Sequence, residues 1–207
     1  MEKLLEKHPA LAKCKKELKD ALDILISSYT KGGTLFACGN GGSSADADHI
    51  VGELMKGFLK KRPLDCDLRE DLRSNFDGVD DGMLDKLQGA LPAISLGSAS
   101  ALNSAFSNDV DPELVYAQAL FGLGKRGDVL IAISTSGNSK NVLAAAKLAR
   151  ALEISVIALT GEGGGKLRDI ADVCIAVPEC ETYLVQELHL PVYHWLCAKL
   201  EDHFFAE

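Results

Sequence analysis

The sequence lacks the features that mark membrane, secreted and nucleic-acid-binding proteins. No stretch of its 207 residues approaches the ~20 consecutive apolar residues of a membrane span, and its charged beginning has no apolar signal-peptide core. Basic residues are outnumbered, with 22 Lys and Arg against 30 Asp and Glu and a net charge of −8, which disfavours a nucleic-acid-binding surface. We therefore expect a soluble, cytoplasmic protein with neither a nucleic-acid nor a membrane partner.

Several common motifs are also missing. The six cysteines form no CxxC pair, so we expect reduced and mostly buried thiols rather than a disulfide framework or a cysteine metal site. Neither the dinucleotide pattern GxGxxG nor the P-loop, with its lysine after the glycines, is present. These absences disfavour a nucleotide or a nicotinamide or flavin cofactor.

What is present is an alternation of short apolar runs with helical patterns, after one long amphipathic helix predicted from Glu2 to Tyr29. We predict a single α/β domain over residues 1–207, a three-layer sandwich with a central, mostly parallel sheet flanked by helices. A terminal helix is predicted from Tyr183 to Phe205, and residues 60–89 are predicted to be an exposed acidic insertion. The predicted strands are TLFACGN, LPAISLG, DVLIAIST, ISVIALTG and VCIAVP.

Two of these strands end in similar loops, FACGNGGSSADADHI and IAISTSGNSKNVLAA. Each is an apolar strand, then a small polar loop, then a serine at the first turn of a helix. A helix N-terminus leaves N–H groups unpaired and carries partial positive charge, so it favours an anion. We interpret Ser134, Thr135, Ser136 and Ser139 as a phosphate cradle, the alternative being that Ser139 only caps a helix.

Candidate metal-binding or catalytic side chains lie on two of the predicted helices. His49 and Glu53 are four apart on the helix after the first loop, so their side chains share a face ~5–6 Å apart. That spacing suits metal binding or acid/base chemistry. Gln186 and His194 lie eight apart on the terminal helix, and His189 is the competing histidine there.

With these residues in view, the sequence resembles the sugar isomerase (SIS) domain family, and within it the phosphoheptose isomerase group. The resemblance implies a flavodoxin- or Rossmann-like fold and an aldose–ketose isomerase acting on sedoheptulose 7-phosphate to give glycero-manno-heptose 7-phosphate. The segments that carry it are CGNGGSSADADHIVGEL, GDVLIAISTSGNSKNV, VIALTGEGGGKL and VQELHLPVYH.

The resemblance also implies roles for individual residues. Glu53 and His194 would be the catalytic acid/base pair. One zinc ion per subunit would be held by four side chains, namely His49, Glu53, Gln186 and His194. The phosphosugar would contact Asn40, Gly41, Gly42, Ser43, Ser134, Thr135, Ser136, Ser139 and Gln186.

The resemblance further implies a homotetramer, which an apolar stripe on the N-terminal helix also favours. The stripe consists of Leu4, Leu5, Leu11, Leu18, Leu22 and Leu25. Two alternatives stay open. One is a non-catalytic SIS-domain protein that binds phosphosugars or associates with a replication initiator. The other is a related phosphosugar isomerase or lyase, because Tyr183 and Ser98 stand where the family carries acidic residues.

Overall fold

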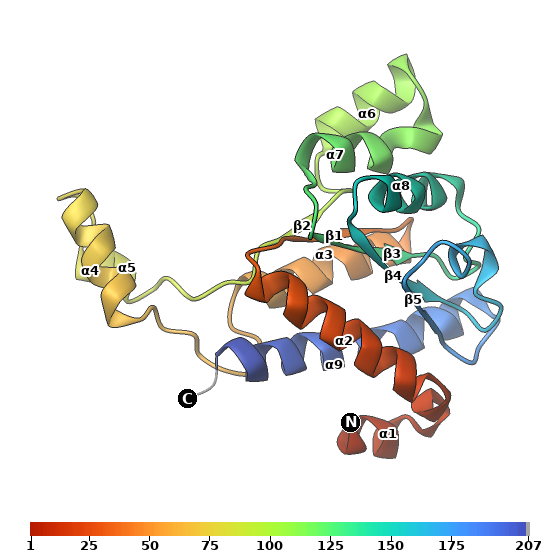
Figure 1. Cartoon of the computed structure of the whole chain (residues 1–207), viewed down its shortest axis with the longest axis horizontal. Helices are drawn as coiled ribbons and strands as arrows, with labels where there is room; N and C mark the ends of the chain where they lie inside the picture. Colours follow the sequence, from red (N-terminus) through yellow and green to blue (C-terminus); the bar gives the residue numbers. More distant parts are fainter. Residues whose placement is uncertain (206–207) are drawn as a thin grey trace.

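The computed structural model describes residues 1–205 and has a five-stranded parallel sheet at its centre (Figure 1). The strand order is β2-β1-β3-β4-β5, and every neighbouring pair is parallel. All five predicted strands and the predicted α/β class are therefore confirmed. The strands are β1 (Leu35–Cys38), β2 (Ala93–Ser95), β3 (Val129–Ile133), β4 (Ser155–Thr160) and β5 (Val173–Ala176).

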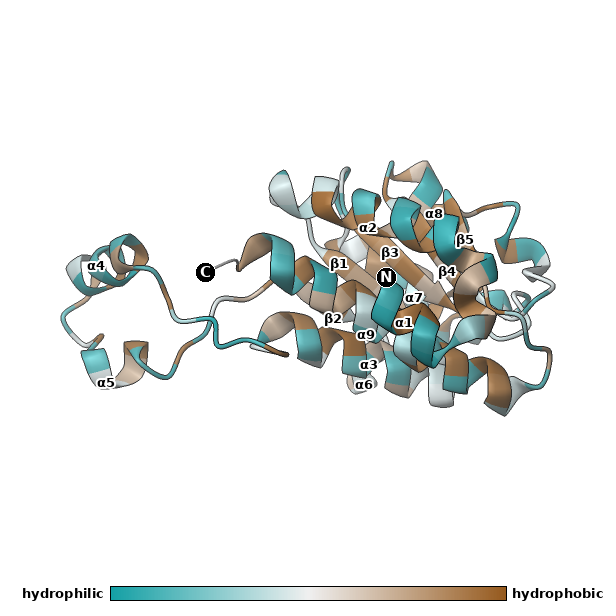
Figure 2. Ribbon diagram, turned by 90° about the horizontal axis from the view of Figure 1, so that it is seen from below, coloured by the Kyte–Doolittle hydropathy of each residue, from teal (hydrophilic) through white to brown (hydrophobic). Residues whose placement is uncertain are grey.

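Helices cover both faces of this sheet, which gives the predicted three layers (Figures 1 and 2). One face packs against α2 (Lys15–Thr30), α3 (Gly42–Met55) and α9 (Thr182–Phe204). The other packs against α7 (Val115–Leu123) and α8 (Lys140–Ala151), with α6 (Ser100–Asp109) beside α7. Strands β1, β3 and β4 are almost wholly buried, as expected for a parallel sheet covered on both sides.

The prediction of one helix from Glu2 to Tyr29 is wrong. The segment consists of α1 (Glu2–Lys7), a 3-10 helix (Pro9–Cys14) and α2. Pro9 explains the break, because a proline disfavours helical backbone at the residue before it and has no N–H to donate. His8 accordingly has φ −129° and ψ 72°, outside the helical region.

The apolar stripe on these segments is mostly covered within the single chain. It therefore does not support the predicted self-association. Leu4, Leu11, Leu18 and Leu25 are all buried in the core between the sheet, α3 and α9. Leu5 and Leu22 are only partly buried and pack against the same core. The sequence-based argument failed because it assigned this stripe to one sheet face, whereas it also packs against α9.

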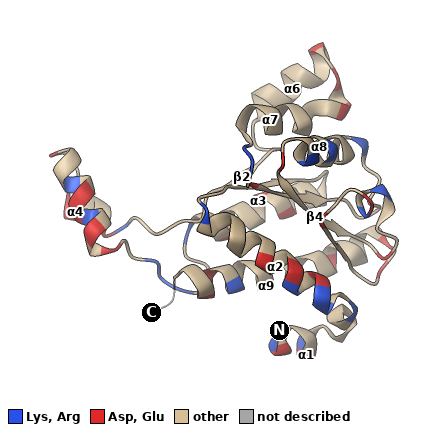
Figure 3. Ribbon diagram, in the orientation of Figure 1, with Lys and Arg blue, Asp and Glu red and all other residues tan. Residues whose placement is uncertain are grey.

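Residues 60–89 form an arm whose helical part stands away from the rest of the molecule (Figures 1 and 2), while Arg62 at its base is buried against the body. It carries α4 (Cys66–Asn75) and α5 (Asp81–Leu84), with acidic and basic residues along α4 (Figure 3). Arg69 joins the two helices through Asp81 and Asp85. An isolated antiparallel bridge between Pro63 and Gln88 joins the chain segments that enter and leave the arm at its base.

Candidate functional site

The site begins where the strand order reverses. In the order β2-β1-β3-β4-β5, the chain goes from β1 to β2 on one side and then crosses back to β3 on the other side of β1. Open α/β sheets bind ligands at the carboxyl ends of the strands beside such a switch point. The two loops that resemble each other follow β1 and β3, so the fold places them next to each other.

A pair of side-chain amides joins these two loops. Asn40, after β1, donates to Asn141 Oδ1 at 2.9 Å, and Asn141, in the first turn of α8, donates back to Asn40 Oδ1 at 2.9 Å. The Tyr116 hydroxyl also reaches this loop, lying 2.5 Å from the Gly39 carbonyl and 3.2 Å from Asn40 Oδ1. The predicted binding residue Asn40 is thus fixed by two partners that the sequence did not reveal.

The glycines of the first loop meet two different needs. Gly41 has φ 56°, in the left-handed region that favours glycine. At Gly42 the need is space, because a Cβ there would lie 2.7 Å from Gln186 Nε2. Gln186 on α9 therefore lies against the first turn of α3, beside the predicted binding residues Gly41, Gly42 and the buried Ser43.

In the second loop the predicted phosphate ligands differ in exposure. Ser136 is exposed, Thr135 and Ser139 are half-buried, and Ser134 is buried. Ser134 Oγ lies 2.9 Å from Ser139 Oγ, so these two hydroxyls share a hydrogen bond. Gly137 closes the turn with φ 66°, and a Cβ there would lie only 2.0 Å from the Gly164 carbonyl oxygen.

Ser139 occupies the N-cap position of α8, as predicted, but its side chain makes no capping hydrogen bond. In the first turn of α8 the Val142 N–H bonds Asn141 Oδ1, whereas among residues 1–205 no side chain satisfies the N–H groups of Lys140 and Asn141, and the exposed Ser136 lies in the loop beside them. Unpaired N–H groups of this kind are the usual donors to a phosphate.

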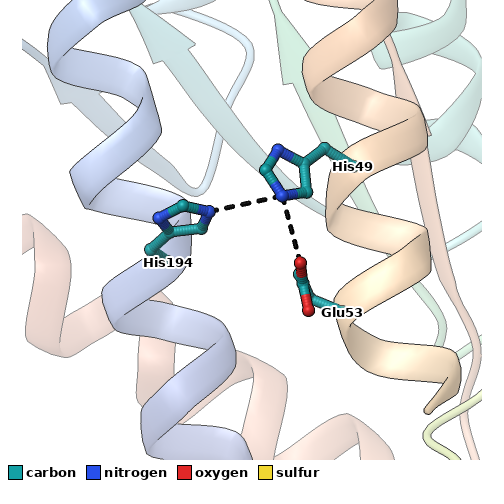
Figure 4. Close-up of side chains that lie close together, drawn as sticks. All are labelled: His49, Glu53 and His194. Atoms are coloured by element: carbon teal, nitrogen blue, oxygen red, sulfur yellow. Dashed lines mark hydrogen bonds and ion pairs between the residues drawn. The ribbon is translucent and has the colours of Figure 1, made fainter. Parts of the chain in front are cut away.

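Three side chains from two helices converge, and one of these helices, α3, begins at the first loop (Figure 4). His49 and Glu53 come from α3 and His194 from α9, and one ligand atom of each lies within 4.8 Å of the other two. His49 Nε2 is 3.1 Å from Glu53 Oε1 and 3.4 Å from His194 Nε2. We call these residues the His49–Glu53–His194 cluster.

The cluster fits a zinc ion in both donor type and spacing. Histidine nitrogens and a carboxylate are common zinc ligands, and around a tetrahedral ion with bonds of ~2.0–2.2 Å the ligand atoms lie ~3.3–3.6 Å apart. The separations of His49 Nε2 from Glu53 Oε1 and from His194 Nε2 are close to this range. Within residues 1–205, Glu53 Oε2 is buried and makes no hydrogen bond, and its charged neighbour is Lys56 Nζ at 3.5 Å, so this carboxylate retains an oxygen for a ligand or a proton.

Tyr193 and Asp46 hold His49 from behind. The Tyr193 hydroxyl donates to Asp46 Oδ1 at 3.2 Å and lies 3.0 Å from His49 Nδ1. Since the hydroxyl proton points to Asp46, its oxygen accepts from Nδ1–H, which leaves the lone pair of His49 on Nε2, toward the cluster. Burial and the neighbouring His49 together lower the pKa of His194, which favours its neutral, basic form.

The terminal helix separates its three candidate residues. His194 joins the cluster, Gln186 lies against Gly42, and His189 is buried in the core. His189 Nε2–H donates to the Thr160 carbonyl at 3.2 Å, and burial lowers the pKa of His189 to about 4. The competing histidine is therefore a core residue, while Gln186 as a metal ligand stays a prediction.

Buried His189 should make folding stability depend on pH. Between pH 6.5 and about 4 the unfolded chain binds a proton that folded His189 does not, so stability falls as the pH falls, by about 3 kcal/mol in total. Urea unfolding at pH 7, 5 and 4 checks this. His189→Gln, which keeps a donor for Thr160, should lose this part of the pH dependence, whereas His203→Gln at an exposed position should keep it. Equal pH dependence in the native protein and His189→Gln would contradict the prediction.

Six residues of this region were missed by the sequence analysis. Asp46 had a signal, since it precedes His49 by three and Glu53 by seven and so shares their helix face. The other five act across contacts between segments distant in sequence, which no local pattern reveals. They are Asn141, Tyr116, Tyr193 and a buried ion pair of Arg62 with Glu201.

The fold and the site define a doubly wound α/β domain. It has two small polar loops at helix N-termini, of the kind that bind anions, and the His49–Glu53–His194 cluster. The SIS domain family model matches residues 3–76 and 82–161, and the chain belongs to this family. The resemblance noted in the sequence is thereby confirmed. The match is interrupted in the arm, between α4 and α5.

Within the family, the chain is similar to proteins named phosphoheptose isomerase. It is 36% identical to that of Rhodospirillum rubrum over 192 residues, covering 93% of this chain and 88% of the relative. It is 40% identical to that of Mycobacterium tuberculosis over 184 residues, covering 89% and 81%. The structure of the Neisseria gonorrhoeae phosphoheptose isomerase superposes with a TM-score of 0.76 at 31% identity, covering 95% and 91%.

Proposed function

We propose that the protein is a phosphosugar isomerase that interconverts sedoheptulose 7-phosphate and glycero-manno-heptose 7-phosphate. The observation that carries this proposal is the convergence of His49, Glu53 and His194 beside two anion-type loops, in a chain similar over most of its length to phosphoheptose isomerases. The alternative of a non-catalytic binding protein is not favoured, since its ligand would need the loops but not the cluster.

Aldose–ketose isomerisation needs a base for the proton next to the carbonyl and an acid for the proton on oxygen. Glu53 suits the base, because its Oε2 atom has no hydrogen-bond partner among residues 1–205. Neutral His194, whose pKa is lowered by burial, can exchange the oxygen proton on the other side of the enediolate. Each contribution is typically worth ~10²–10⁴-fold in rate.

We propose that one zinc ion per subunit is held by the cluster, with Gln186 as a further ligand. When bound, zinc would polarise the substrate carbonyl. Tyr193 and Asp46 would keep His49 in the tautomer that presents Nε2. The two oxygens of Glu53 permit one to face the ion and the other to face the substrate.

The direct test is to incubate the purified protein with sedoheptulose 7-phosphate, with and without zinc, and to separate substrate from product by chromatography. We expect conversion to the aldose phosphate that depends on zinc. Binding of the phosphosugar with no conversion in either condition would reject the proposal and favour the binding protein.

The second loop should supply most of the affinity for the phosphate. Ser136→Ala combined with Ser139→Ala should weaken phosphosugar binding at least ~10-fold, because hydrogen bonds to a charged acceptor are worth ~1.5–3 kcal/mol each. Isothermal titration measures the affinity, and circular dichroism checks the fold. Ser104→Ala, on the exposed surface of α6, is the control. Unchanged affinity in the folded double variant would place the phosphate elsewhere.

We further propose a cytoplasmic homotetramer. Self-association is supported by large apolar side chains that are exposed on and around α6 and α7, since such patches often mark protein interfaces. They are Leu102, Val110, Leu114, Phe121 and Leu123. Light scattering that shows only monomer at micromolar concentration would reject the tetramer.

The cytoplasmic location is supported by the thiols. All six cysteines are free within the described chain, which agrees with a reducing compartment. No helix of residues 1–205 has the length and apolar character needed to span a membrane.

A further inference from the structure

An ion pair between Arg62 and Glu201 is buried where the arm joins the body. The side chains of Arg62 and Glu201 are 0% and 1% exposed, and Arg62 Nε donates to Glu201 Oε1 at 2.8 Å. The guanidinium carbon lies 4.5 Å from the centre of the Phe205 ring. A buried pair carries a large desolvation cost and is by itself weak evidence of a stabilising role, so its other contacts decide what it does.

Arg62 caps the helix that carries His49 and Glu53. Its Nη1 donates to the Leu54 carbonyl at 2.8 Å and its Nη2 to the Glu53 carbonyl at 3.1 Å. These carbonyls belong to the last turn of α3, where helix carbonyls have no partner within the helix and a positive charge is favoured. Arg62 thus binds the backbone of Glu53 itself.

Glu201 holds the other side of the same contact. Its carboxylate accepts from the backbone N–H groups of Phe58, Leu59 and Lys60 at 2.8, 2.7 and 3.1 Å, so the segment after α3 is tied to α9. Glu201 lies seven residues after His194 on α9, which places both on one face of that helix two turns apart.

The pair therefore links the two helices that build the cluster. α3 supplies His49 and Glu53, α9 supplies His194, and between the two helices Arg62 and Glu201 form a fixed bridge of five hydrogen-bonded backbone groups and one ion pair. Catalytic and metal-ligand constellations need positions held to ~0.5 Å. Lateral movement of α3 against α9 would change the separation of Glu53 and His194 directly.

We propose that the Arg62–Glu201 pair is a positioning device that fixes α3 against α9 and so sets the geometry of the His49–Glu53–His194 cluster. Neither residue enters the cluster itself. This role rests on the proposed function, in which the cluster binds zinc and moves protons.

The test is Arg62→Lys, which keeps the charge but lacks the planar fork needed to reach Glu201 and two carbonyls together. We expect zinc to bind at least ~10-fold more weakly and turnover to fall ~10-fold or more, as for other residues that orient metal ligands. The Michaelis constant for the phosphosugar should stay within about threefold, because the loop after β3 is untouched. Zinc affinity is measured by competition with a chromophoric chelator.

The matched control is Arg150→Lys, the same substitution in an ion pair that joins α8 to Asp172 and contacts neither cluster helix. It should leave zinc affinity and turnover within about twofold. If Arg62→Lys does not fold, Glu201→Asp tests the same bridge, since it keeps the charge but withdraws the carboxylate by one methylene.

A folded Arg62→Lys with a lower melting temperature but native zinc affinity and turnover would overturn the proposal and leave a purely structural pair. Crystal structures give an independent readout, since the three ligand atoms should spread beyond their 4.8 Å limit in the variant. A native protein that binds zinc but isomerises no phosphosugar would reject the proposed function, whereas the comparison of zinc affinities would still decide the role of the pair.

Discussion

Glu53→Gln and His194→Asn are each expected to lower isomerase turnover by ~10²-fold or more. Glutamine keeps the size and the hydrogen-bonding reach of Glu53 but cannot take a proton, and asparagine removes the imidazole of His194, which can both accept and donate one. The Michaelis constant should change far less, because the predicted phosphate ligands lie on the separate loop after β3. Steady-state kinetics on sedoheptulose 7-phosphate measure both quantities.

The control for these substitutions is His203→Asn, on the same helix as His194 but exposed near its end. It should keep turnover within about threefold. His189 is unsuitable, because it is fully buried and its substitution would change the stability of the fold. Native turnover in both folded variants, Glu53→Gln and His194→Asn, would reject the proposed acid/base pair.

Removal of the metal should have an effect as large as that of the acid/base substitutions. A chelator is expected to abolish turnover, and added zinc to restore it, because the cluster brings three zinc-type ligand atoms within 4.8 Å of one another. His49→Ala removes one of these ligands without touching the proposed acid or base. It should lower both metal content, measured by atomic emission, and turnover.

The exposed His203→Ala should leave metal content and turnover unchanged, which separates the cluster from histidines in general. If chelator-treated protein retains full turnover, the isomerase would not depend on zinc, and Glu53 and His194 would act alone. If His49→Ala binds zinc like the native protein, the metal would lie outside the cluster.

Local patterns in the sequence were enough for much of the fold. Five buried apolar runs ending in turn residues gave all five strands, because strands in a covered parallel sheet are apolar on both faces. The spacing of His49 and Glu53 placed both on one helix face, since residues four apart on a helix are neighbours. The same kind of reasoning failed at Pro9, where a continuous apolar period hid a break in the backbone.

The sequence by itself thus determined the α/β class, the two polar loops after β1 and β3, and the helical pair His49 and Glu53. Helix spacing alone could not choose between His189 and His194, and only the family resemblance favoured His194, because the way α9 faces the sheet decides which of the two is buried. It also gave no sign of Arg62 and Glu201, which lie 139 residues apart and meet only when α3 packs beside α9. Periodicity reports neighbours along one element, whereas these contacts depend on how two elements pack, and only the tertiary structure fixes that.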